Sequence, residues 1–138
     1  MRSLFRVGIG ILAVVFGAVG ISGAQDGLTK RDARGAVTVA VTLLAPPIVG
    51  SAIKARVVLD THSVGLDSIE LEQAVILRGA DGVDLGPSAV EQAAGGGHHR
   101  QAVLVFPPTA QAGAVQIIVK NVGGVAERSF VWDVAPAR

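Results

Sequence analysis

The histidines are the residues of this sequence whose type and placement best suit chemistry. There are three, His62, His98 and His99, and all of them lie next to the ends of predicted strands. A neutral imidazole is a good ligand for Zn²⁺ or Cu²⁺, and a carboxylate can complete the ligand set. Asp60 and Asp67 lie on either side of His62. These five residues therefore form a candidate site for a divalent metal ion, zinc or copper(II), or for a small ligand.

The rest of the composition excludes several kinds of metal site and catalytic site. The chain has 138 residues and no cysteine, and its single methionine is Met1. Disulfides, thiolate metal sites and soft copper(I) sites are therefore excluded. The Gly-x-Ser-x-Gly elbow, the phosphate-binding loop and the His-Glu-x-x-His motif are all absent from the sequence. We therefore expect a non-enzymatic protein, and a hydrolase that uses His and Asp is the least favoured alternative.

A second interpretation gives the histidines a purely structural role. Asp60, Thr61 and Ser63 are ordinary strand-end and turn formers, and the glycines at 95–97 are typical of a plain hairpin tip. On this interpretation the chain is an interaction or structural module that recognises a protein partner through its loops or an edge strand. Stoichiometric metal after purification would favour the first interpretation, and a co-purifying protein would favour the second.

The elements that must position these residues follow from a hydrophobic pattern of period two. Alternation of apolar and polar residues predicts strands at residues 37–43, 53–60, 69–78, 88–93, 102–106, 115–120 and 130–134. Residues 66–74 are the best helix candidate, but their Ile-Glu-Leu-Glu alternation favours a strand. About seven antiparallel strands at this spacing are typical of an immunoglobulin-like or fibronectin-like sandwich, so the fold class is all-β.

The same alternation predicts which side chains form the core. The strongest candidates are apolar residues in phase with their strand neighbours: Val57, Leu59, Leu77, Val105, Ile117 and Trp132. On the last strand, Arg128 and Asp133 are expected to face solvent.

Loop parity connects the two histidine motifs. If successive strands run up and down, the loops at about 61–68, 94–100 and 121–124 lie at the same end of the sandwich. If Leu59 points inward and the strand continues as far as His62, Asp60 and His62 point outward on one face. Adjacent residues in extended backbone point in opposite directions, so only one of His98 and His99 can reach the side of His62.

The motif Leu-Asp-Thr-His-Ser-Val-Gly-Leu-Asp at 59–67 is followed by Gly-Gly-His-His-Arg at 96–100 and then by an apolar strand that ends in Phe-Pro. In combination these motifs resemble a group of extracytoplasmic prokaryotic β-sandwich proteins. The resemblance covers roughly residues 36–134. It implies a secreted or anchored sandwich and a shared histidine site, and it brings no established activity.

The N-terminus indicates where the protein works. Arg2 and Arg6 precede an apolar run, and the small residues Ser22-Gly23-Ala24 follow it. This is the pattern of a secretory signal peptide at 1–24, so the protein is expected to be periplasmic or secreted. Residues 25–35 are polar and predict a flexible lead-in, and residues 36–138 form the sandwich domain.

The alternative for this segment is an uncleaved membrane anchor. Residues 7–25 carry no charge and are just long enough to span a bilayer. Contact with a membrane is expected only in that case. The formal net charge of the chain is +1, so we expect no nucleic-acid partner.

Overall fold

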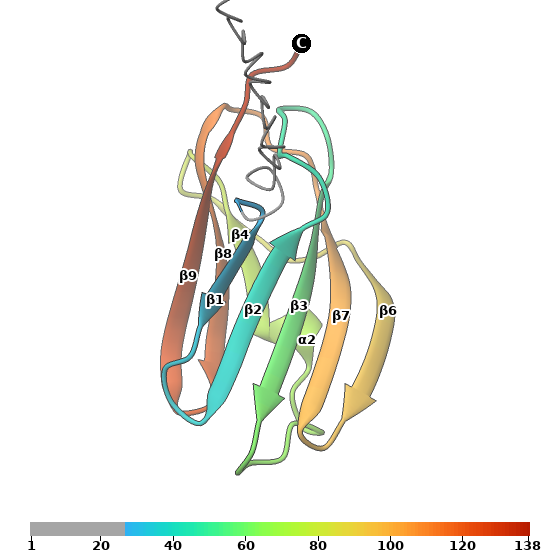
Figure 1. Cartoon of the computed structure of the whole chain (residues 1–138). Coiled ribbons are helices and arrows are strands. Elements are labelled where there is room, and N and C mark those ends of the chain that lie inside the picture. The colour runs from blue at the N-terminus through green and yellow to red at the C-terminus, as the bar shows by residue number, and fades with distance from the viewer. Residues whose placement is uncertain (1–26) are drawn as a thin grey trace, which may run out of the picture.

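The protein is a sandwich of two antiparallel β-sheets (Figure 1). The computed structural model describes residues 27–138, so the expected signal peptide at 1–24 lies outside the described residues. The first sheet has the order β1 (Thr29–Asp32), β2 (Val37–Leu43), β3 (Ile53–Thr61), β7 (His99–Phe106), β6 (Ala89–Gly96). The second has the order β5 (Asp84–Leu85), β4 (Val75–Arg78), β8 (Gly113–Val122), β9 (Val125–Val134).

The strand order confirms the predicted fold class. The row β2-β3-β7-β6 packs against β5-β4-β8-β9, which is the arrangement of the A, B, E and D strands against C′, C, F and G in immunoglobulin-like sandwiches. Seven of these nine strands correspond to the expected ones. The two additional strands, β1 and β5, are short and lie at sheet edges.

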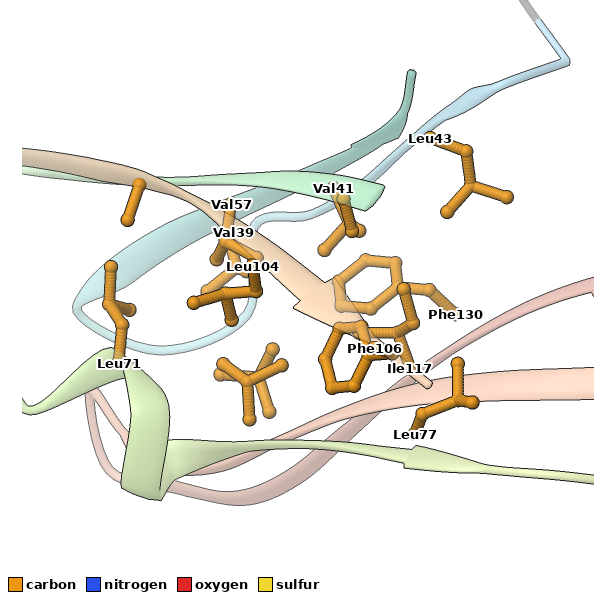
Figure 2. Close-up of a cluster of buried hydrophobic side chains, with 14 of the residues drawn as sticks. Val39, Val41, Leu43, Val57, Leu71, Leu77, Leu104, Phe106, Ile117 and Phe130 are labelled. Atoms are coloured by element: carbon orange, nitrogen blue, oxygen red, sulfur yellow. The ribbon is translucent and has the colours of Figure 1, made fainter. Parts of the chain in front are cut away.

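The core lies between the inward faces of the two sheets, as Figure 2 shows for residues of both layers. Alternate residues of β2 and β3 are buried, so a period of two in the sequence becomes one apolar face. Five of the six predicted core residues are buried: Val57, Leu59, Leu77, Ile117 and Trp132. The prediction for Val105 is wrong, because Leu104 and Phe106 take the inward positions of β7 and leave Val105 half-buried on the outer face.

The prediction that Arg128 faces solvent is also wrong. Arg128 shares the inward phase of Phe130 and Trp132 on β9, and it is fully buried. Its guanidinium donates hydrogen bonds to the carbonyl oxygens of Val37 (2.9 Å), Arg34 (2.7 Å) and Val122 (3.1 Å). A buried charge is tolerated when it is well hydrogen-bonded, and here backbone carbonyls accept from both terminal nitrogens, Nη1 and Nη2, whereas Nε has no partner within the described residues.

Residues 25–35, expected to be a flexible lead-in, contain a strand instead. β1 pairs with β2 from Thr29↔Thr42 to Asp32↔Val39. Its residues are mostly exposed. An edge strand of this kind is held by backbone hydrogen bonds and needs no apolar alternation, so the sequence pattern could not reveal it.

The expected strand at 69–78 is wrong in its first half. Residues 71–74 form the single helical turn α2 (Leu71–Ala74), and β4 begins only at Val75. The N–H groups of Gln73 and Ala74 both donate to the carbonyl oxygen of Glu70, at 3.0 and 2.9 Å. The chain crosses between the sheets here, and the turn buries Leu71 against the core. No helix within residues 27–138 has the length and apolar character needed to cross a membrane.

Candidate functional site

Three loops meet at one end of the sandwich, as loop parity predicts. The N–H of Thr61 donates to the carbonyl oxygen of His98 (3.0 Å), and the N–H of Leu66 donates to that of Gly97 (2.8 Å). These two bonds join the β3–α2 loop to the β6–β7 hairpin. The segments that carry His62 and His98 are therefore neighbours in space, and in Figure 1 both lie at the lower end of the molecule.

The β8–β9 turn belongs to the same end. The N–H of Ala36 donates to the carbonyl oxygen of Gly123 (3.1 Å), and the Thr61 hydroxyl donates to the carbonyl oxygen of Ala36 (2.7 Å). Thr61 therefore connects three segments that are far apart in sequence. The Thr61 hydroxyl oxygen also accepts from the N–H of Ser63 (3.2 Å), which turns the chain directly after His62.

Asp60 and His99 form the only part of the candidate site that is assembled within the described residues. They lie opposite each other on β3 and β7, on the outer face of the first sheet. His99 Nδ1 is 2.5 Å from Asp60 Oδ1, and the side chains are 55% and 49% exposed. An ionised carboxylate can only accept, so Nδ1 carries the proton and donates. In the neutral imidazole Nε2 is then the unprotonated nitrogen, which is the one that can bind an ion.

His62 and His98 lie on the two loops that flank this pair, and both are exposed. His98 occupies the turn between β6 and β7, and its carbonyl oxygen accepts the bond from Thr61. His62 follows the last residue of β3, two positions after Asp60. Because β3 ends at Thr61 and His62 lies in the bend that follows, the alternation of β3 does not determine where the His62 side chain points.

Asp67 has a different contact. Its Oδ1 accepts from the backbone N–H of Gly97 (3.0 Å), and its carbonyl oxygen accepts from Arg100 Nη1 (3.2 Å). A Cβ on Gly96 would lie 2.8 Å from Asp67 Oδ1, so the glycine allows this close approach. Asp67 and Arg100 thus fix the hairpin that presents His98 and His99. The positioning role of Thr61 was not predicted, because no sequence motif indicates it.

The glycines of the hairpin adopt backbone conformations that other residues rarely adopt. Gly95 has φ +85° and Gly97 has φ +60°. A Cβ on Gly95 would collide with the carbonyl oxygen of His99, whereas a Cβ on Gly97 would meet no atom within 4 Å. A glycine is therefore needed at position 95 for the close backbone contact that places His99 opposite Asp60.

The five predicted ligands do not converge on one point. Within residues 27–138 no group of three or more His, Cys, Asp or Glu side chains is placed to hold a metal ion. The structure brings Asp60 and His99 into contact, keeps His62 and His98 on the adjacent loops, and engages Asp67 with the hairpin backbone.

Comparisons of this chain with protein-family models, with curated proteins and with solved structures found no match.

Proposed function

We propose that the chain is a non-catalytic, extracytoplasmic β-sandwich that binds a divalent transition-metal ion, Zn²⁺ or Cu²⁺, at the histidine-bearing end. The observation that carries the proposal is the hydrogen bond from His99 Nδ1 to Asp60. Histidines that bind metals usually donate their other ring N–H to a carboxylate, which orients the ring and makes the free nitrogen more basic. The Asp60–His99 pair has this arrangement at an exposed strand end.

The ligand set follows from where the residues lie. His99 binds through Nε2, and Asp60 positions it. His62 is the second ligand, because it lies two positions after Asp60 on the loop that flanks the Asp60–His99 pair, and water completes the coordination. An exposed two-histidine site of this kind suits an ion that exchanges with solvent. A closed structural zinc site would need four protein ligands.

Asp67 takes no part in this ligand set. Its carboxylate receives the N–H of Gly97, and turning it toward an ion would leave that N–H without this partner. The role of Asp67 in the proposal is to hold the β6–β7 hairpin in place.

The test is a titration of the purified, chelator-treated chain with Zn²⁺ and Cu²⁺ by isothermal calorimetry. We expect one ion per chain, and loss of binding in His99→Ala. Asp60→Asn should weaken binding by about tenfold to a hundredfold, the usual effect of losing a carboxylate behind a metal-bound histidine. Asp133→Asn is the matched control, since Asp133 is an exposed carboxylate on β9.

Variants of the other two histidines test which of them is a ligand. His62→Ala should abolish binding or weaken it strongly, whereas His98→Ala should retain it. At a hundredfold excess of ion over Kd, the fold should gain about 2.7 kcal/mol of stability. A wild-type chain that binds neither ion, or a His99→Ala variant that binds like the wild type, would leave the histidines with a structural role only.

The location outside the cytoplasm rests on the N-terminal pattern of two arginines, an apolar run and Ser22-Gly23-Ala24. Mass spectrometry of the exported protein should find a chain that begins near Gln25. An intact N-terminus in the membrane fraction would favour the anchored alternative, with the sandwich on the outer side.

A further inference from the structure

The two ends of the sandwich differ in charge. At the end opposite the histidines, three segments carry no charged side chain: 44–52, 107–112 and 135–137. Backbone hydrogen bonds join them, because the N–H of Gly50 donates to the carbonyl oxygen of Thr109 (3.1 Å) and the N–H of Val49 donates to that of Ala135 (2.9 Å). The adjacent β4–β5 turn contributes one charge, Asp81. We call the three segments the apolar end, which lies at the top of the molecule in Figure 1.

The apolar end exposes apolar side chains to solvent. Leu44 is 42% exposed. Further exposed apolar residues come from all three segments: Ala45, Pro46, Pro108, Ala110, Ala135, Pro136 and Ala137. Next to Leu44 lies a groove of about 240 Å³ whose one charged lining residue, Lys54, has its ammonium group 3.3 Å from the Glu91 carboxylate. An exposed apolar surface of this kind indicates contact with a protein or a membrane.

The described part of the chain begins at this same end. The N–H of Leu43 donates to the carbonyl oxygen of Leu28 (2.9 Å), and Trp132 Nε1 donates to that of Gly27 (3.0 Å). The first of these bonds continues the antiparallel register of β1 against β2 by one residue, which places Gly27 beside Leu44. The chain therefore enters the fold at the apolar end.

The sequence that precedes Gly27 is suited to a bilayer. Residues 7–25 carry no charge and are just long enough to span it. Only Asp26 lies between them and Gly27. Two residue steps reach at most about 7 Å, so a bilayer that holds residues 7–25 must have its surface close to the apolar end.

We propose that, in the full chain, the apolar end rests on the lipid bilayer that holds residues 7–25. The bilayer is the occupant because the short connection through Asp26 places it there. The lack of charge in the three segments is an independent observation that fits a bilayer, since a charged side chain would have to lose water to make this contact. The arrangement lasts until residues 1–24 are removed, and it is permanent in an anchored chain.

This orientation points the histidine-bearing end away from the bilayer. β9 has ten residues, so the sandwich is about 33 Å long. The histidines at the far end then face the surrounding water, from which an ion can reach them. The contact involves none of the proposed metal ligands, so either proposal can fail without the other.

The test uses single-cysteine variants, because the chain has no cysteine of its own. The full chain is synthesised in a cell-free system, without signal peptidase, in the presence of vesicles of phosphatidylethanolamine and phosphatidylglycerol. Ser51→Cys reports on the apolar end, and Ser63→Cys, at an exposed serine beside His62, is the matched control. A fluorophore at 51 should lose most of its emission to a quencher attached to the lipid headgroups, whereas one at 63, about 30 Å away, should keep nearly all of it.

A charge variant separates contact from tethering. Leu44→Glu should reduce the quenching at 51 by about twofold or more, because a hydrated carboxylate keeps the apolar end off the bilayer. Val64→Glu, at a 38% exposed valine of the histidine-bearing end, should leave it unchanged. Equal quenching at 51 and 63, no quenching at either position, or quenching at 51 that Leu44→Glu does not reduce would each overturn the proposal. Resistance of the sandwich to protease confirms that the labelled chains are folded.

Discussion

At the scale of single residues, one side chain can serve several segments. Arg128 is the clearest case, because its buried guanidinium binds carbonyl oxygens from the β1–β2 turn, β2 and the end of β8. Arg128 is not one of the candidate metal ligands. It does hold in place the segment that contains Ala36, whose carbonyl oxygen accepts from the Thr61 hydroxyl. The candidate site therefore depends on a residue whose chemistry is purely structural.

Replacing Arg128 by methionine should destabilise the fold by about 3 kcal/mol or more, since each buried carbonyl left without a donor costs about 1–3 kcal/mol. Arg128→Lys should cost less, because an ammonium group retains donors for some of these carbonyls. Urea denaturation measures both variants. Arg56→Met on the exposed face of β3 is the control and should stay within about 0.5 kcal/mol of the wild type. A small effect of Arg128→Met would mean that water replaces the guanidinium at this corner.

The ion pair between Asp32 and Arg34 predicts a dependence of stability on pH. Hydrogen bonds from Arg34 hold the pKa of Asp32 below its ordinary value. A carboxyl group whose pKa is depressed by folding adds stability above its unfolded pKa, and this stability is lost as the pH falls through the folded value. Below about pH 4 the wild type should therefore lose more stability than Asp32→Asn. Thermal unfolding from pH 7 to pH 3 tests this, with Asp133→Asn as the control, which should follow the wild type.

At the scale of elements, the β6–β7 hairpin determines where His99 lies. Gly95→Ala should destabilise the protein by about 2 kcal/mol or more, because the new Cβ meets the carbonyl oxygen of His99 and the residue must keep a positive φ. Gly97→Ala is the matched variant in the same turn. It also has a positive φ but open space around its Cβ, so it should cost about 1 kcal/mol.

Chemical denaturation gives the two stabilities, and metal titration adds a functional measurement. Gly95→Ala should also weaken ion binding, because the strain displaces His99 from Asp60. Equal stabilities for the two alanine variants would show that the hairpin relaxes around the added methyl group.

The elements also show where sequence patterns succeed. Strands with one buried face, such as β2 and β3, are predictable because their alternation is imposed by the core. β1 was missed because an exposed edge strand has no such alternation. The turn α2 was missed because a four-residue helix that buries Leu71 leaves a pattern too short to distinguish from a strand. The burial of Arg128 shows that alternation can outweigh polarity, since its position is in phase with Phe130 and Trp132.

At the scale of the whole molecule, topology made the candidate site predictable in part. The parity of the connections was enough to place the loops of His62 and His98 at one end, as their hydrogen bonds confirm. Whether their side chains converge depends on rotamers and on the exact end of β3, which alternation does not determine. The contact between Asp60 and His99 required the register of β3 against β7, and that register is a property of the assembled sheet.

Trp132 joins the two sheets of the sandwich along the side where β1 and β9 lie. Trp132 lies on β9 in the second sheet and is 7% exposed, and its Nε1 donates to the carbonyl oxygen of Gly27 (3.0 Å), just before β1 of the first sheet. The Lys30 ammonium group lies 5.5 Å from the centre of the indole ring. One side chain thus links the two sheets through packing, a hydrogen bond and a cation–π contact.

Trp132→Ala should therefore cost about 3–5 kcal/mol in urea denaturation, the usual range for removing a packed aromatic ring. Trp132→Phe retains much of the packing but loses the donor to Gly27, so it should cost about 1–2 kcal/mol. Lys30→Met removes only the cation and should stay within about 1 kcal/mol of the wild type. This order of costs is expected if burial of the indole ring contributes most of the energy that holds β1 to β9. If Trp132→Phe proved as costly as Trp132→Ala, the hydrogen bond to Gly27 would be the dominant link, and β1 would be held to the second sheet by that contact.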